Sequence, residues 1–121
     1  MSRGCLQIQR TDGQWYWAEY STFSISDEVG KYQLTVDGYR GDAGDAVTEP
    51  AVPVHMSNGQ MFSTLDSDND VNVNENCATN QGGGWWYGNC AKSELNKDDN
   101  GHWSFDLTND VQASRMLVKL N

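Results

Sequence analysis

Basic residues and long apolar segments are both scarce in this sequence. Eight Lys and Arg stand against seventeen Asp and Glu, which leaves a net charge of −9 over 121 residues. This balance argues against nucleic acid and against anionic membranes as partners, because both are bound through clustered basic residues. No segment approaches the roughly 20 apolar residues of a transmembrane helix, so membrane insertion is not expected. The composition favours cations, basic proteins or neutral ligands.

Cysteine is limited to three residues. Cys77 and Cys90 lie close enough in the sequence for a local disulfide, and such a loop stabilises a fold by about 3 kcal/mol. A disulfide indicates an oxidising, extracellular setting, so a secreted protein is expected, although the start MSRGC carries no signal peptide. Cys5 is then left for a bridge to another chain, a missing partner or a free thiol. The alternative is an intracellular protein with three reduced thiols.

Alternating apolar and polar residues predict strands in the first forty residues. Asp12 and Gly13 are typical of a hairpin turn, so the first two strands are expected to pair. In the third strand the alternation predicts one apolar face formed by Tyr32, Leu34 and Val36. The expected antiparallel meander has strands at residues 5–10, 15–25 and 31–37.

The remaining sequence is rich in turns and polar loops. Residues 60–65 predict a short strand, residues 114–120 a final strand, and residues 77–79 a helical turn. We therefore expect one α+β domain over residues 1–121, with a small antiparallel sheet and long loops. Loops of this length need a metal or a disulfide to organise them.

The segment DSDND at residues 66–70 places Asp66, Asp68 and Asp70 at alternate positions. Carboxylate oxygens are the ligands that Ca²⁺ prefers in proteins. The segment is not an EF-hand, because Val71 stands where that loop needs glycine and Cys77 where it needs glutamate. The alternative is a solvated acidic loop without a metal.

The segment GGGWWYGNC at residues 82–90 combines flexible backbone with large aromatic rings. Adjacent side chains of an extended segment point to opposite sides. One of Trp85 and Trp86 is therefore expected in the core and the other at a surface, and the alternative is plain core packing. His55 and His102 lie in no nucleophile or metal motif, so we expect no enzyme.

Several segments in a fixed order resemble the fibrinogen-related domain, the C-terminal globular module of fibrinogen chains, ficolins, tachylectins, angiopoietins and tenascins. The likeness covers residues 6–96 almost without a break, resumes weakly at HWSF and SRMLVKLN, and includes S-x-LN at residues 93–96. It implies a fibrinogen C-terminal-like fold and a secreted recognition protein. The segments that carry it are WAEYSTFSISDEVGKYQLTVDGYRGDAGDA, NGQMFSTLDSDND and NCATNQGGGWWYGNC.

The resemblance implies a calcium site in residues 66–77. Its carboxylates would be Asp68 and Asp70, its main-chain carbonyls those near Asn72 and Asn74, and Asp66 would help or form the turn. The segment from Asp70 to Cys77 is one residue longer than in the family. A site of this kind in an extracellular module binds Ca²⁺ weakly, with Kd on the order of 10⁻⁴ M.

The resemblance also implies the Cys77–Cys90 disulfide, which closes a ligand pocket within residues 66–90. In the lectin-like members a cis peptide, here Asn89–Cys90, aims backbone N–H groups at an acetyl group. Aromatic side chains line the pocket, and here these would be Trp85, Trp86, Tyr87 and Trp103.

This chain departs from the family pattern around the pocket. Ala91 replaces the histidine that lectins carry, and Gln81 replaces an aromatic or acidic residue. The loop before the last strand is short, and the family's N-terminal subdomain is absent from this sequence. Two functions follow: lectin-like binding of acetylated or related glycans in defence, or a protein-interaction or structural module. The second includes a homo-oligomer or a covalent partner through Cys5.

Overall fold

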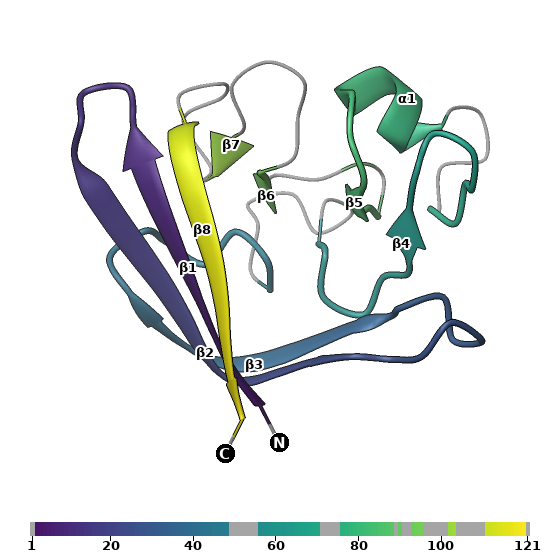
Figure 1. The fold of residues 1–121 in the computed structure, drawn as a ribbon, viewed down its shortest axis with the longest axis horizontal. Helices are drawn as coiled ribbons and strands as arrows, with labels where there is room; N and C mark the ends of the chain where they lie inside the picture. Colours follow the sequence, from purple (N-terminus) through teal and green to yellow (C-terminus); the bar gives the residue numbers. More distant parts are fainter. Residues whose placement is uncertain are drawn as a thin grey trace.

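The computed structural model describes residues 2–48, 56–70, 76–88, 90, 93–95, 102–103 and 111–120. Its main feature is an antiparallel sheet of four strands in the order β3-β2-β1-β8. The first three strands form the predicted meander, and the last one pairs with β1, so the two ends of the chain lie together (Figure 1). The strands are β1 (Ser2–Arg10), β2 (Trp15–Ile25), β3 (Leu34–Gly41) and β8 (Val111–Leu120).

Smaller elements lie beside one face of this sheet, which we call the inner face (Figure 1). Two short antiparallel pairs, β4 with β5 and β6 with β7, accompany one helix of five residues. The described chain is therefore mostly β, and the predicted α+β class holds only loosely. The small elements are β4 (Phe62–Ser63), α1 (Cys77–Gln81), β5 (Trp85–Trp86), β6 (Ser93–Glu94) and β7 (His102–Trp103).

The hairpin between β1 and β2 forms where the sequence predicts it. Gly13 has φ 89°, a left-handed conformation that glycine adopts without a steric cost. Its N–H donates to the carbonyl of Arg10 at 2.9 Å, and Asp12 Oδ1 accepts from the N–H of Gln14 at 2.8 Å. Local turn chemistry thus fixes the register of β1 and β2.

The third strand begins later than its alternation predicts. Lys31 and Tyr32 have φ of 58° and 56°, so both lie in a left-handed turn and not in a strand. The carbonyl of Lys31 accepts from the N–H of Phe62 at 3.0 Å, and that of Tyr32 accepts from the Trp86 indole at 2.9 Å. Tyr32 is exposed, so its predicted place on the apolar face beside Leu34 was wrong. Tertiary hydrogen bonds outweigh the local pattern here.

The core fills the space between the inner face and the small elements. Trp85 is 1 % exposed and Trp86 6 %, and their rings meet edge to face at 5.1 Å between centroids. The expectation that one indole lines a surface is therefore wrong, since both pack inside. The sheet contributes most of the remaining core side chains: Leu6, Ile8, Ala18, Tyr20, Phe23, Leu34, Val36 and Val111.

Other boundaries follow the sequence in part. The strand predicted at residues 60–65 is reduced to Phe62–Ser63, and the last strand begins earlier than predicted, at Val111. The predicted helical turn is α1, whose N-cap Asn76 accepts through its side chain from the N–H of Thr79. Short polar N-caps of this kind supply an acceptor for an otherwise unpaired amide.

Candidate functional site

The acidic segment 66–70 forms a tight loop directly after β4. The main chains of Thr64 and Ser67 bond to each other in both directions, at 3.0 and 3.2 Å. Asp66 Oδ1 accepts from the Thr64 hydroxyl at 2.7 Å, and this hydrogen bond lowers the pKa of the Asp66 carboxyl. Asp66 thus serves the turn, which leaves Asp68 and Asp70 as the candidate metal ligands.

Asn69 fastens this loop to two other parts of the chain. Its side-chain amide donates to the carbonyl of Phe62 at 2.9 Å, and its backbone N–H donates to Ser63 Oγ, which is fully buried. Lys31 Nζ donates to Asn69 Oδ1 at 3.1 Å. Sequence reasoning missed Asn69 and Lys31, because nothing in their spacing indicates that residues 38 apart in the chain meet.

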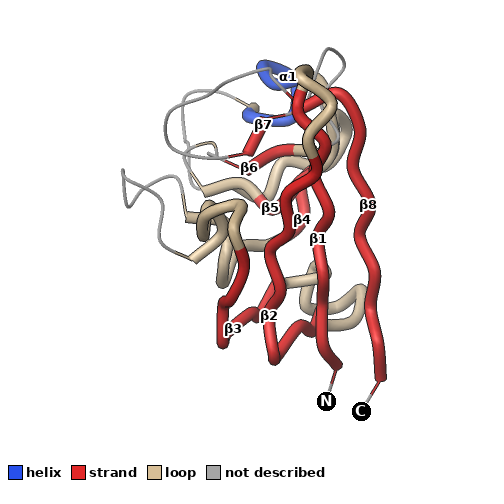
Figure 2. Tube along the Cα trace, turned by 90° about the vertical axis from the view of Figure 1, so that its left-hand side faces the viewer, coloured by secondary structure: helices blue, strands red, loops and turns tan. Residues whose placement is uncertain are grey.

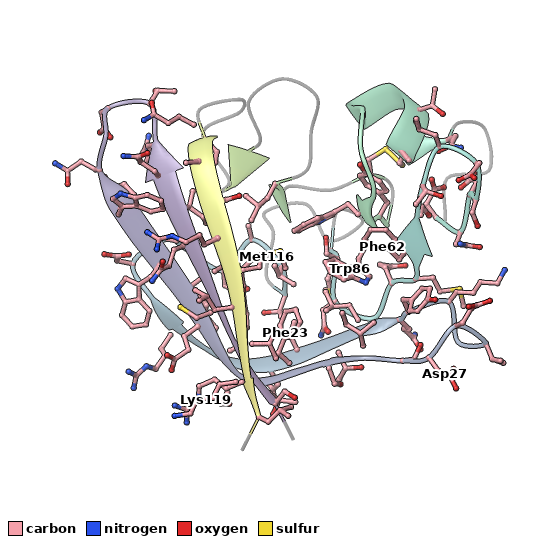
Figure 3. All side chains as sticks on the ribbon, in the orientation of Figure 1. Phe23, Asp27, Phe62, Trp86, Met116 and Lys119 are labelled. Carbon is pink, nitrogen blue, oxygen red and sulfur yellow. A yellow bond between two sulfur atoms is a disulfide. The ribbon has the colours of Figure 1, made fainter. Side chains whose placement is uncertain are left out.

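Asp68 and Asp70 join the loop to the segment that follows it. Asp68 Oδ1 accepts from the N–H of Asp70 at 3.3 Å, and Asp70 Oδ2 accepts from the N–H of Cys77 at 2.9 Å. The second bond connects the acidic loop to the first residue of α1 and so to the disulfide (Figure 3, upper right).

The donors at this loop fit a hard cation in part. Two carboxylates of one short loop supply the oxygen ligands that Ca²⁺ prefers. In the part of the chain that the structure describes, no three His, Cys, Asp or Glu side chains converge as a metal-binding group. A cation at Asp68 and Asp70 therefore also needs main-chain oxygens, and the predicted ones, at Asn72 and Asn74, lie outside the described residues.

The predicted disulfide is present between Cys77 and Cys90, whose Cα atoms lie 5.3 Å apart. Cys77 is fully buried at the start of α1, so the bridge anchors the helix beneath the loop. Cys5 is a free cysteine on β1, and burial, followed by the nearby Glu19 carboxylate, raises the pKa of its thiol. Cys5 is therefore a protonated thiol at neutral pH.

Three of the four aromatic residues predicted as pocket walls, Trp85, Trp86 and Tyr87, are buried, and their polar atoms bond inside the protein. The Trp85 indole donates to Ser57 Oγ at 3.2 Å, and the Tyr87 hydroxyl donates to the carbonyl of Gly83 at 2.6 Å. Together with Trp86 they support the segment from within, and their role as walls of a ligand pocket stays a prediction.

The remaining predicted pocket residues are not part of the described site. Asn89 and Ala91 lie outside the described residues, and so does the predicted cis peptide before Cys90. The side chains of Gln81 and Trp103 lie outside the description as well. The described site is thus the acidic loop, the disulfide and the aromatic support beneath them.

Comparison with known families connects this arrangement to one domain type. Residues 3–116 match the family described as fibrinogen beta and gamma chains, C-terminal globular domain. This chain belongs to the fibrinogen-related domain family. The resemblance seen in the sequence is thereby confirmed, and the fibrinogen C-terminal-like fold is shown as well by a solved relative. The fibrinogen-like globe domain of human ANGPTL2 superposes with a TM-score of 0.84 and 31 % identity, over 98 % of this chain and 57 % of that one.

Curated relatives of this fibrinogen-related chain include a fibrinogen chain and a techylectin-like protein. The fibrinogen beta chain of Gallus gallus is 35 % identical over 102 residues, which cover 75 % of this chain and 22 % of that protein. A techylectin-like protein of Phoneutria nigriventer is 44 % identical over 80 residues, covering 66 % of this chain and 33 % of that protein. The chain thus spans a third or less of these relatives.

The setting of the family is extracellular. Its related proteins are secreted or extracellular, which agrees with a disulfide in this chain. No helix among the described residues has the length and apolar character needed to cross a membrane.

Proposed function

We propose that this chain is a calcium-stabilised, non-catalytic recognition domain of a secreted protein, with lectin-like binding of acetylated or related glycans. One observation carries the proposal: Asp70 Oδ2 accepts from the N–H of Cys77. This contact couples the acidic loop to the disulfide-closed segment 77–90, where the ligand would bind. A cation on Asp68 and Asp70 would therefore order both the loop and the segment beside it.

Each group of residues has a distinct part in this proposal. Asp68 and Asp70, with carbonyls at Asn72 and Asn74, hold Ca²⁺, which neutralises the repulsion between the two carboxylates. Asn69 and Lys31 keep the loop against β4. Backbone N–H groups near Asn89 and Cys90 receive the acetyl oxygen of the ligand, as the family resemblance and the techylectin-like relative suggest.

The calcium part is tested by thermal melts in millimolar Ca²⁺ and in EDTA. A ligand of the native state adds RT ln(1 + [L]/Kd), which is about 2.7 kcal/mol at a hundredfold excess over Kd. We expect Ca²⁺ to raise the Tm of wild type by several degrees and to leave Asp68→Ala/Asp70→Ala unchanged. Asp66→Asn is the matched control, because Asp66 bonds Thr64 and should keep the calcium response. Equal responses of all three proteins would refute the site.

The glycan part is tested on a column of immobilised N-acetylated sugar. Wild type should bind and should elute with free sugar and with EDTA. Gln81→Ala should keep the calcium-dependent Tm and change only the sugar affinity. A chain that responds to calcium but never binds the column is not a lectin.

A second function, a protein-interaction module, is favoured by the burial of Trp85, Trp86 and Tyr87. Without exposed aromatic walls, a sugar has less apolar surface to contact. Strand β8 also exposes apolar side chains at a sheet edge, and such edges invite a partner chain. Concentration-dependent association without sugar binding would select this alternative.

A further inference from the structure

The outer face of the sheet, which points away from α1, β4 and β5, concentrates positive charge in an otherwise acidic protein. Strand alternation places the cationic side chains of Arg3, Arg40, Arg115 and Lys119 on it. Figure 3 shows Lys119 on this side and Met116 on the inner side, toward Trp86. In Figure 2 the four strands are viewed from this outer side. Half of the eight basic residues of a chain with net charge −9 thus share one surface.

Acidic side chains are outnumbered on this face. Among the described positions that point outward on the four strands, the acidic residues are Glu19, which pairs with Arg40 at 3.3 Å, and Asp37, which is exposed on β3. Asp42 lies just beyond β3 and accepts from the backbone N–H of Trp17. No ion pair to Arg115 is found in the described part of the chain. The face therefore carries a local positive excess.

Aromatic rings hold the guanidinium groups in place on this surface. Arg115 lies over the ring of Trp15 at 4.8 Å, and Arg40 lies over the ring of Trp17 at 5.6 Å. Both indoles are substantially exposed, at 43 % and 36 %. A guanidinium stacked on an indole keeps the N–H donors at its edge available for a carboxylate or sulfate. Stacking also removes part of the ordering cost of binding.

A hollow opens between these groups. Its volume is about 250 Å³, enough for roughly eight waters at about 30 Å³ each, or for one substituted sugar ring. Trp15, Tyr16, Trp17 and Arg115 line it together with the amide of Gln7. The hollow thus combines aromatic side chains, an amide and one guanidinium group.

The spacing of the charges fits an extended chain better than a single anion. Arg3 and Lys119 are paired across β1 and β8, four residues from Gln7 and Arg115. At about 3.4 Å per residue the two groups stand about 14 Å apart along the strands. One phosphate or sulfate reaches only one of them, whereas a polymer with regular anionic substituents reaches both.

We infer that the outer sheet face binds a sulfated polysaccharide, with one sulfated ring seated over Trp15, Gln7 and Arg115 and the chain continuing to Arg3 and Lys119. Charge complementarity and pre-stacked guanidinium groups support this partner. Nucleic acid fits less well, because single-stranded binding relies on open aromatic faces for base stacking, and here guanidinium groups stack on the indoles. The site is separate from the acidic loop and requires no Ca²⁺.

Heparin is the probe, on a column and in solution, in buffer with EDTA. Arg115→Gln removes one stacked cation, and Lys31→Gln is the matched control, since it removes the same charge from an exposed site away from the sheet face. We expect Arg115→Gln to weaken binding about tenfold, the effect of one charge-assisted hydrogen bond, and Lys31→Gln to elute like wild type. Trp15→Leu, which changes no charge, should also weaken binding.

Other outcomes would overturn the inference. Equal losses in Arg115→Gln and Lys31→Gln would show a non-specific charge effect, and so would full retention of Trp15→Leu. Tighter binding of a single-stranded oligonucleotide than of heparin would assign the face to nucleic acid. Self-association that Arg115→Gln abolishes would assign it to a second copy of the chain. Thermal melts confirm folding, and if Trp15→Leu does not fold, the comparison of Arg115→Gln with Lys31→Gln decides.

Discussion

The indole N–H of Trp86 donates to the carbonyl of Tyr32 at 2.9 Å, across 54 residues of sequence. This contact connects the buried strand β5 to a turn whose backbone is left-handed at both Lys31 and Tyr32. Non-glycine residues in that conformation cost about 1–3 kcal/mol each, so surrounding contacts must hold them. The turn that carries Lys31 to the acidic loop is thus fixed from the core.

Replacing Trp86 by phenylalanine tests this contact. The variant loses the indole N–H and part of a buried ring, so we expect the free energy of unfolding to fall by about 2–4 kcal/mol. Urea unfolding measures the change. Trp15→Phe, at an exposed site, should cost under about 1 kcal/mol, and equal costs at the two positions would contradict the account.

Tyr20 predicts how stability depends on alkaline pH. Its hydroxyl donates to Asp45 Oδ1 at 2.8 Å, and burial, then the Asp45 carboxylate, raises the pKa of Tyr20 far above its usual 10. Above pH 10 the unfolded tyrosine loses its proton while the folded one keeps it. The free energy of unfolding should therefore hold below pH 10 and fall above it, by up to about 1.4 kcal/mol per pH unit.

Tyr20→Phe isolates this contribution. The variant should lose about 1–3 kcal/mol at neutral pH, because Asp45 loses one donor and keeps Thr48. Its decline above pH 10 should be shallower than that of wild type, as measured by denaturant titrations at several pH values. Tyr16→Phe serves as the control for loss of a half-exposed hydroxyl. Parallel pH curves for Tyr20→Phe and wild type would contradict the prediction.

Reduction of the Cys77–Cys90 disulfide should destabilise the fold. The chain-entropy model gives a loss of about 3 kcal/mol for a loop of this length. Thermal melts with and without reductant should show this loss equally in wild type and in Cys5→Ala, because Cys5 forms no bridge within the chain. Cys77→Ala/Cys90→Ala should not respond to reductant, and a response would point to a bridge through Cys5.

Gly4 on β1 tests how tightly the inner face is packed. A Cβ at this position would stand 2.7 Å from Cγ of Phe23, which is closer than carbon atoms approach. Gly4→Ala should therefore cost about 1–3 kcal/mol by overpacking. In the Phe23→Leu background, Gly4→Ala should cost less free energy of unfolding than it does in wild type, because the smaller side chain at position 23 leaves room for the added Cβ. If urea unfolding shows that the free-energy losses of the two single variants simply add in the double variant, this contact is contradicted.

The sequence predicts best what local chemistry controls. The Asp12–Gly13 turn and the alternation in β1 predict a hairpin, and the structure contains both the turn and the pairing of β1 with β2. The prediction of the third strand is wrong at Tyr32, because hydrogen bonds from Phe62 and Trp86 impose a turn there that the neighbouring residues do not indicate. The prediction that one of Trp85 and Trp86 lies at a surface is wrong for a related reason. Alternation predicts that the two side chains point in opposite directions, but the core encloses both.

At the candidate site the same division applies. The acidic pattern and the family resemblance single out Asp68 and Asp70, and the resemblance gives the disulfide that the structure contains. Neither indicates Asn69 or Lys31, which fasten the loop through contacts between distant segments. Hydrogen bonds between residues far apart in the chain leave no periodicity for a sequence to display.

The amino-acid sequence by itself determined the family, the first hairpin, the disulfide partners and the acidic loop, because each rests on neighbouring residues or on a preserved order of motifs. Only the tertiary structure decided where charge gathers. Arg3, Arg40, Arg115 and Lys119 come from both ends and the middle of an acidic chain. Strand pairing brings them to one face. The electrostatic potential at that face depends on the charges that lie close to it in space and not on the net charge of the chain.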